Sequence, residues 1–91
     1  MINNLTSNQL NFGKVNVTLN PTQFPNVDVK NSVIITNLSG TTVYLGNSNV
    51  NVASGFPITV GSVLITPFEN LSMLYICCPS GYNCDVRYLI A

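Results

Sequence analysis

The chain has 91 residues, of which 46% are hydrophobic and only 7% are charged, and its formal net charge is zero. Soluble domains ordinarily carry about 25% charged residues, so the surface has to be built from uncharged polar side chains, and the sequence holds 14 asparagines. The three cations are scattered along the chain and cannot follow a phosphate backbone, which argues against nucleic-acid binding.

A low charge content and a net charge of zero favour association over solubility as a monomer, and the cores of protein interfaces are likewise depleted in charge. The composition therefore indicates a subunit of an assembly, although a coding bias toward asparagine gives the same composition. The first residues lack the cationic and apolar regions of a signal peptide, and no apolar run approaches about 18 residues. We therefore expect synthesis in the cytoplasm, no leader and no membrane span.

The N-terminal third predicts an arm followed by one clear strand. Residues 1–13 contain isolated apolar side chains without a period, and we expect an extended arm that ends at Gly13. Residues 14–19 alternate between apolar and polar side chains, as a half-buried strand does, and Pro21 ends this strand. In residues 27–30 two valines alternate with charged residues, which predicts a short edge segment with its charges on the open side.

The densest β-branched sequence lies in residues 32–65. Residues 32–38 carry apolar side chains on both faces, which predicts a central strand. A serine–glycine turn signal follows, and residues 41–45 are expected to pair back on the first strand as a hairpin. Residues 46–57 form a long polar loop with glycine and proline, and residues 62–65 form the next strand.

The C-terminal part predicts a second hairpin. Residues 73–78 are almost wholly apolar and form a strand, residues 79–83 form a five-residue loop, and residues 84–90 return as a strand. On the returning strand Asp85 and Arg87 are two residues apart, so they share a face and can pair.

The whole pattern is six to seven short strands with turn signals about 8–12 residues apart, and no segment has a sustained helical period. This pattern predicts an all-β fold, a small antiparallel β-sandwich or barrel of six to seven short strands with an extended N-terminal arm. Residues 14–91 form a single β-sandwich domain, and residues 1–13 form the arm.

The residues needed for common catalytic chemistry are missing or scattered. The chain has no histidine, which removes the usual triad base and the commonest neutral metal ligand. The three acids stand at Asp28, Glu69 and Asp85, and nothing predicts that two of them meet within the roughly 5–10 Å that glycoside hydrolysis requires. No glycine-rich phosphate motif is present. We predict a protein that is not an enzyme, with no catalytic residue and no cofactor.

The three cysteines are best explained as small hydrophobic residues. Cys77 and Cys78 are adjacent on a strand and point to opposite faces, while Cys78 and Cys84 flank the predicted loop and are placed for a disulfide that cytosolic synthesis disfavours. Three thiols without a histidine or a fourth cysteine make a poor zinc site. We expect buried free cysteines and no metal.

Two further motifs have simple explanations. Four Asn-x-Ser/Thr sequons begin at Asn4, Asn16, Asn37 and Asn70. They are expected by chance in an asparagine-rich chain, and glycosylation is not expected without a secretory signal. Three tyrosines fall within predicted strands and are expected to pack in the core: Tyr44, Tyr75 and Tyr88.

Four residues in predicted loops remain as candidate partner contacts. Phe56 ends the long loop and Tyr82 lies at a hairpin tip, while Asn47 and Asn49 belong to the same loop as Phe56. Exposed aromatic rings stack on sugars and asparagine amides bond to hydroxyl groups, so these residues also permit a carbohydrate-binding function.

Residues 33–57, VIITNLSGTTVYLGNSNVNVASGFP, resemble a pattern that recurs in small tailed-bacteriophage virion proteins. The shared features are a strand that ends in an xITNxS turn, a TVYLG strand, an NSNV loop and a Gly-aromatic-Pro step. An LYIC strand and a terminal DVRYLI continue the resemblance, which covers residues 32–91. The double cysteine and the shortage of charge depart from the pattern.

The resemblance implies a non-enzymatic structural role and brings no catalytic residues. The expected function is to decorate or stabilise the capsid as a head accessory or head-fibre-base protein, through contacts with other virion proteins and as a homo-oligomer. The expected location is the virion, after synthesis in the host cytoplasm. The alternatives are a neck or tail accessory protein and a carbohydrate- or host-surface-binding β-module. Nucleic acid and membrane are not expected partners.

Overall fold

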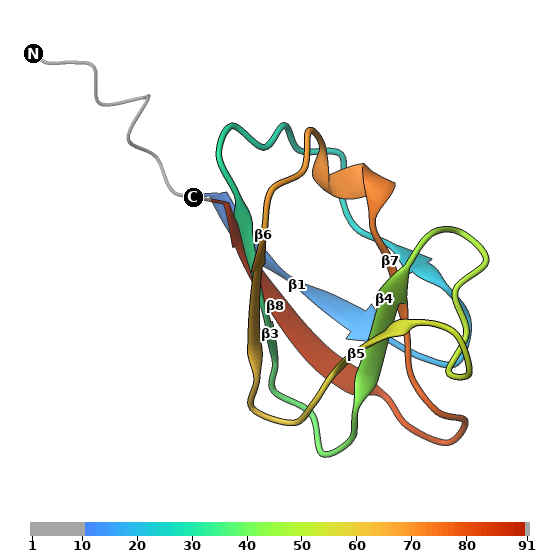
Figure 1. Cartoon of the computed structure of the whole chain (residues 1–91). Helices are drawn as coiled ribbons and strands as arrows, with labels where there is room; N and C mark the ends of the chain where they lie inside the picture. The colour runs from blue at the N-terminus through green and yellow to red at the C-terminus, as the bar shows by residue number, and fades with distance from the viewer. Residues whose placement is uncertain (1–10, 91) are drawn as a thin grey trace, which may run out of the picture.

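The structure of the chain, a computed structural model, describes residues 11–90 and contains eight strands in two four-stranded antiparallel sheets (Figure 1). Sheet A has the order β1 (Asn11–Val17), β8 (Cys84–Ile90), β3 (Val33–Asn37) and β6 (Val63–Thr66). Sheet B has the order β2 (Thr22–Gln23), β7 (Tyr75–Cys77), β4 (Val43–Gly46) and β5 (Phe56–Ile58). The 3-10 turn η2 (Leu71–Met73) precedes β7.

The predicted all-β class is confirmed, and β3 has the predicted central position between β8 and β6. The eight strands exceed the expected six to seven, because the two-residue β2 and the proline-containing β5 carry no strand signal of their own. Residues 27–30, expected as an edge segment, make one isolated bridge from Asp28 to Asn70.

The boundary of the predicted arm at Gly13 is wrong. Asn11, Phe12 and Gly13 belong to β1 and lie opposite β8, whereas residues 1–10 of the arm lie outside the described part of the chain. Gly13 is needed in this strand because the ring of Tyr88 fills the space beside it. A Cβ atom at Gly13 would lie 2.6 Å from the Tyr88 hydroxyl oxygen.

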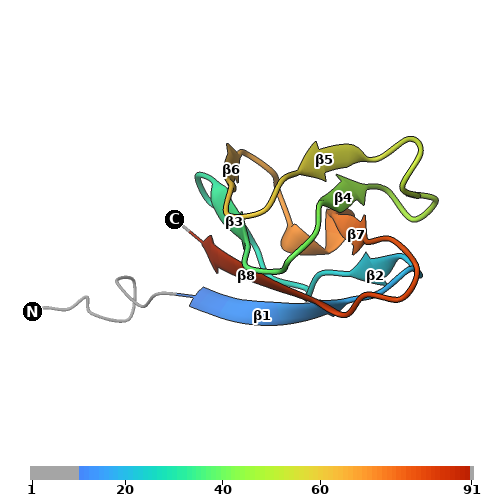
Figure 2. The same ribbon diagram turned by 90° about the horizontal axis from the view of Figure 1, so that it is seen from below.

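The two sheets lie against each other (Figure 2). They share one apolar core, built from the alternate side chains that face inward. In sheet A, Val15 and Val17 lie opposite Val86 and Cys84, and all four side chains are buried. Phe24, which follows β2, packs edge-on against Tyr88 with ring centroids 6.1 Å apart, so it joins one sheet to the other.

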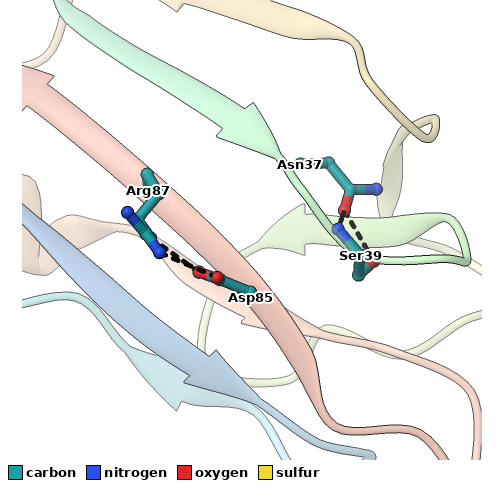
Figure 3. Close-up of polar contacts among 4 residues, drawn as sticks. All are labelled: Asn37, Ser39, Asp85 and Arg87. Atoms are coloured by element: carbon teal, nitrogen blue, oxygen red, sulfur yellow. Dashed lines mark hydrogen bonds and ion pairs between the residues drawn. The ribbon is translucent and has the colours of Figure 1, made fainter.

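The predicted hairpin of residues 32–38 and 41–45 does not form, because β3 lies in sheet A and β4 lies in sheet B. The buried Asn37 side chain directs this crossing. Its Nδ2 donates to the carbonyl oxygens of Thr41 (2.9 Å) and Ile58 (2.8 Å), and its Oδ1 accepts from the Ser39 N–H (2.9 Å; Figure 3). The turn is thereby bonded to β5 of the opposite sheet.

The second predicted hairpin is also wrong, since β7 belongs to sheet B and β8 belongs to sheet A. The connection of residues 79–83 crosses between the sheets. The N–H of Cys78, at its start, donates to the Thr18 carbonyl oxygen just beyond β1 (2.8 Å). The segment that follows β7 is thus bonded to the segment that follows β1.

The turn between β5 and β6 sets the register of β6. The Ser62 N–H donates to the Thr59 carbonyl oxygen (3.0 Å), and Gly61 has φ +76°, as a type II turn requires. The Gly61 N–H then donates to the Asn37 carbonyl oxygen (2.9 Å), and the Asn37 N–H donates to the Ser62 carbonyl oxygen (3.2 Å). Gly61 and Ser62 of one chain segment thus lie opposite the single residue Asn37, which is the arrangement of a G1 bulge.

Asparagine side chains hold several of the turns. Asn37, Asn47, Asn51 and Asn70 each accept with Oδ1 from the backbone N–H two residues later, at 2.9 Å in every case. Two of these asparagines begin the sequence Asn-Leu-Ser, in which the serine hydroxyl also donates to Oδ1 (2.6 and 2.7 Å). The sequons at these two positions are therefore structural turns, and the side chain of Asn37 is fully buried.

Candidate functional site

The outer face of sheet A carries a continuous row of apolar side chains across all four strands. Phe12 of β1 lies opposite Leu89 of β8, Leu89 lies opposite Ile34 of β3, and Ile34 lies opposite Ile65 of β6. We call these four residues the apolar row. Residues directly opposite in an antiparallel pair have their side chains on the same face, so the four side chains are neighbours.

The apolar row faces away from the core. Its strand neighbours on the inner face, such as Val33 and Ile35 beside Ile34, are fully buried. By contrast, Phe12 at one end of the row is 71% exposed and Ile65 at the other end is 65% exposed. Single exposed apolar residues are ordinary, whereas a contiguous exposed patch marks a surface that meets a partner.

The next row of the same face is polar at one end and apolar at the other. Lys14 lies opposite Arg87, Arg87 opposite Thr36, and Thr36 opposite Val63, which is 58% exposed. The charges of this face thus lie on β1 and β8, and the half formed by β3 and β6 has none.

The predicted pairing of Asp85 with Arg87 is confirmed. The Arg87 Nε and Nη2 atoms donate to the two Asp85 carboxylate oxygens at 2.8 and 2.9 Å (Figure 3). This charged hydrogen bond lowers the pKa of Asp85 and raises that of Arg87. The pair is neutral as a unit, so the face keeps little net charge beside the apolar row.

Three of the four predicted contact residues lie around two hollows at the end of β4. Phe56 is 59% exposed and lines an apolar cleft of about 340 Å³ with Leu45, Phe68, Met73 and Leu74. Asn47 borders this cleft and also a second hollow of about 310 Å³, which Asn49 lines.

The loop that holds these residues is bonded to itself, since Asn47 Oδ1 accepts from the Asn49 N–H (2.9 Å). Tyr82 is 50% exposed, but it lies on the connection from β7 to β8 and lines neither hollow. The predicted set is therefore not one site.

Sequence reasoning missed the apolar row. The sequence predicts that Phe12 belongs to the arm and that Ile65 belongs to a strand, and it does not bring the two together. The signal in the sequence is the alternation along β1. Val15 and Val17 face the core, so Phe12 falls on the opposite face, where a polar residue is expected. Joining that position to Ile34 and Ile65 needs the strand order, which a single sequence does not provide.

The cysteines are free and buried, as predicted. Burial raises the pKa of the Cys78 thiol to about 12 and raises that of Cys77 as well, so both thiols stay protonated at neutral pH. Cys78 Sγ lies 3.5 Å from the Val17 and Tyr82 carbonyl oxygens. Among residues 11–90, no group of three or more His, Cys, Asp or Glu side chains is placed to hold a metal ion.

Comparisons with known proteins leave this surface as the main guide to function. A scan against protein-family models, a search of curated proteins and a search of solved structures each found no match. In the part of the chain that the structure describes, no helix is long and apolar enough to cross a membrane.

Proposed function

We propose that this chain is a non-enzymatic structural module that assembles with protein neighbours through the outer face of sheet A. One observation carries the proposal: the apolar row crosses four strands without a polar interruption, and both of its ends are more than half exposed. A partner that covers this row removes apolar surface from water at the centre of the contact, where protein interfaces are depleted in charge.

The energy of covering the row is large enough to matter. Full burial of a phenylalanine or isoleucine side chain contributes roughly 1.5–3 kcal/mol. Phe12 and Ile65 retain 71% and 65% of their exposure, so each would contribute about 1–2 kcal/mol in a well-packed interface. The neighbouring Asp85–Arg87 pair does not oppose contact, since its charges compensate each other.

The assembly that we propose is a bacteriophage virion, in which this β-sandwich module, with its N-terminal arm, decorates or stabilises the capsid. The resemblance of residues 33–57 to small virion proteins supports this choice, and so does the 7% charge content. Neck and tail accessory positions use the same kind of contact and are the nearest alternative.

A carbohydrate- or host-surface-binding function is the second candidate. The observation that favours it is the cleft beside β4, which the exposed Phe56 and the polar residue Asn47 both line. Phe56 is therefore a suitable control position for Phe12, because both phenylalanines are more than half exposed and lie on different surfaces.

The test compares Phe12→Asn with the matched variant Phe56→Asn. Tagged protein is produced in the host during particle formation, and its amount in sedimented particles is measured by mass spectrometry. We expect wild type and Phe56→Asn to sediment with the particles and Phe12→Asn to fall about tenfold, which corresponds to ~1.4 kcal/mol. Absence of the wild type from particles, or equal incorporation of Phe12→Asn, would contradict the proposal. Loss confined to Phe56→Asn would transfer the function to the cleft.

A further inference from the structure

The edges of the two sheets are protected unequally. An edge strand presents unpaired N–H and C=O groups to any other strand, and proteins block such edges with charge, proline or short length. Of the edge strands in residues 11–90, β1 carries Lys14, β2 is only two residues long and has Pro21 before it, and β5 has Pro57 at its centre. The fourth edge, β6 (Val63–Thr66), contains neither a charge nor a proline.

The register shows which groups of β6 are unpaired. The Asn37 N–H donates to the Ser62 carbonyl oxygen (3.2 Å), and bonded pairs in an antiparallel ladder recur at every second residue. Leu64 therefore directs its N–H and C=O toward β3. Val63 and Ile65 direct theirs to the open side of the sheet.

We propose that β6 pairs with β6 of a second copy of this chain, antiparallel and about a twofold axis at Leu64. In that arrangement Val63 lies opposite Ile65 of the partner subunit, and each donates its N–H to the carbonyl oxygen of the other. The contact is isologous, since the same patch serves both copies. The inference rests on the proposed function of assembly through protein contacts and names a second copy as one partner.

The positions of the open groups suit a second copy, because its own β6 presents the same groups at the same spacing. Val63 and Ile65 flank Leu64 symmetrically, so a twofold axis at Leu64 matches each donor with an acceptor. Pro67 directly follows β6 and lacks an N–H. It therefore ends the pairing after Thr66 and disfavours registers that shift the strands past each other.

The side chains on the outer face fit the same pairing. Val63 and Ile65 are 58% and 65% exposed, and directly opposed β-branched residues on neighbouring strands contribute roughly 0.2–1 kcal/mol per pair. The pairing places Ile65, at the end of the apolar row, opposite Val63 of the partner subunit, so exposed apolar side chains meet on both sides of the axis. It brings no charges together, because Lys14 and Arg87 lie on β1 and β8.

The test is Val63→Pro, which removes one open N–H and leaves the bonds between β3 and β6 in place. Proline is tolerated on an edge strand when its nitrogen faces solvent. The matched control is Val60→Pro. Val60 is 55% exposed and precedes Gly61 in the type II turn, a position where proline is favoured.

Molar mass is measured by light scattering during gel filtration as the concentration rises. We expect wild type and Val60→Pro to pass from the 9.8 kDa monomer to a dimer, and Val63→Pro to weaken dimerisation at least about tenfold, or ~1.4 kcal/mol. Amide hydrogen exchange locates the contact: Val63 and Ile65 become protected as the dimer forms, whereas Leu64 is protected in monomer and dimer.

If Val63→Pro does not fold, Ile65→Lys tests the same contact with Leu38→Lys as its control, because Leu38 is 54% exposed and lies outside β6. A wild-type chain that stays monomeric, or a dimer in which the Val63 and Ile65 amides exchange freely, overturns the inference. Phe12-dependent entry of a monomeric chain into particles would refute only the edge pairing. A β6-paired dimer that does not enter particles would refute only the proposed function.

Discussion

Asn37 is a polar residue with no exposed surface, and its side chain is fully used. The amide nitrogen donates to two carbonyl oxygens and the amide oxygen accepts from the N–H and the hydroxyl of Ser39. Its own N–H and C=O bond to the bulge that begins β6. One side chain thus joins the end of β3, the turn before β4 and the end of β5.

Replacing Asn37 tests that role. We expect Asn37→Ala to lower the free energy of unfolding by about 3 kcal/mol, since it removes the Asn37 donor from the buried Ile58 carbonyl oxygen and the acceptor from the Ser39 N–H. Asn37→Asp should destabilise further at neutral pH, because a carboxylate would face both carbonyl oxygens. Urea denaturation measures both variants. The exposed Asn49→Ala is the control and should change stability by no more than about 0.5 kcal/mol; an equal loss there would contradict this account.

At the scale of the element, the turn between β5 and β6 decides how β6 is presented. Gly61 has φ +76° and supplies both the left-handed residue of the turn and the first residue of the bulge. This geometry fixes which residues of β6 point outward and which backbone groups reach the open edge. A different turn would shift the register by one residue and exchange the two faces of the strand.

Gly61→Ala isolates the conformational requirement, because a Cβ atom there would meet no atom within 4 Å. The left-handed conformation costs a residue with a Cβ atom about 1–2 kcal/mol, and we expect that loss in the free energy of unfolding by thermal or chemical denaturation. Gly40 is the control, since a Cβ there also meets nothing and its φ is not positive. A neutral Gly61→Ala variant would show that the bulge does not constrain this position.

At the scale of the whole molecule, the two sheets hide one set of apolar side chains and display another. The inner set forms the core, and the outer set ends at an edge without charge. The Asp85–Arg87 pair is the one ion pair among the described residues. Association should therefore depend on apolar burial and backbone hydrogen bonds rather than on charge.

That dependence predicts a weak response to salt. Exposed charges are screened at separations beyond about 10 Å at 0.1 M ionic strength, so an assembly held by ion pairs dissociates as salt rises. For this chain we expect the monomer–dimer equilibrium to change less than about threefold, below the tenfold that 1.4 kcal/mol represents, between low and high salt in sedimentation equilibrium. A marked dissociation in salt would show that charges hold the copies together.

Local sequence was sufficient for the class of fold and for much of the burial pattern. The alternation in residues 14–19 predicts that Val15 and Val17 share a face, and both are buried, because side chains of a strand point to opposite faces with a period of two. Tyr88, expected in the core, is buried as well. The predicted strand 14–19 includes Leu19, but β1 ends at Val17 and the Leu19 side chain is 51% exposed. The same period placed Asp85 and Arg87 on one face, where they pair.

Strand pairing and the interaction surface were decided only by the tertiary structure. A turn signal states that the chain changes direction, but it does not say whether the chain returns to the same sheet or crosses to the other. Residues 32–38 and 41–45 cross because a buried Asn37 bonds to Ile58, a residue distant in the sequence. The apolar row likewise depends on Phe12 and Ile65 lying on one sheet, which long-range pairing through β8 and β3 brings about.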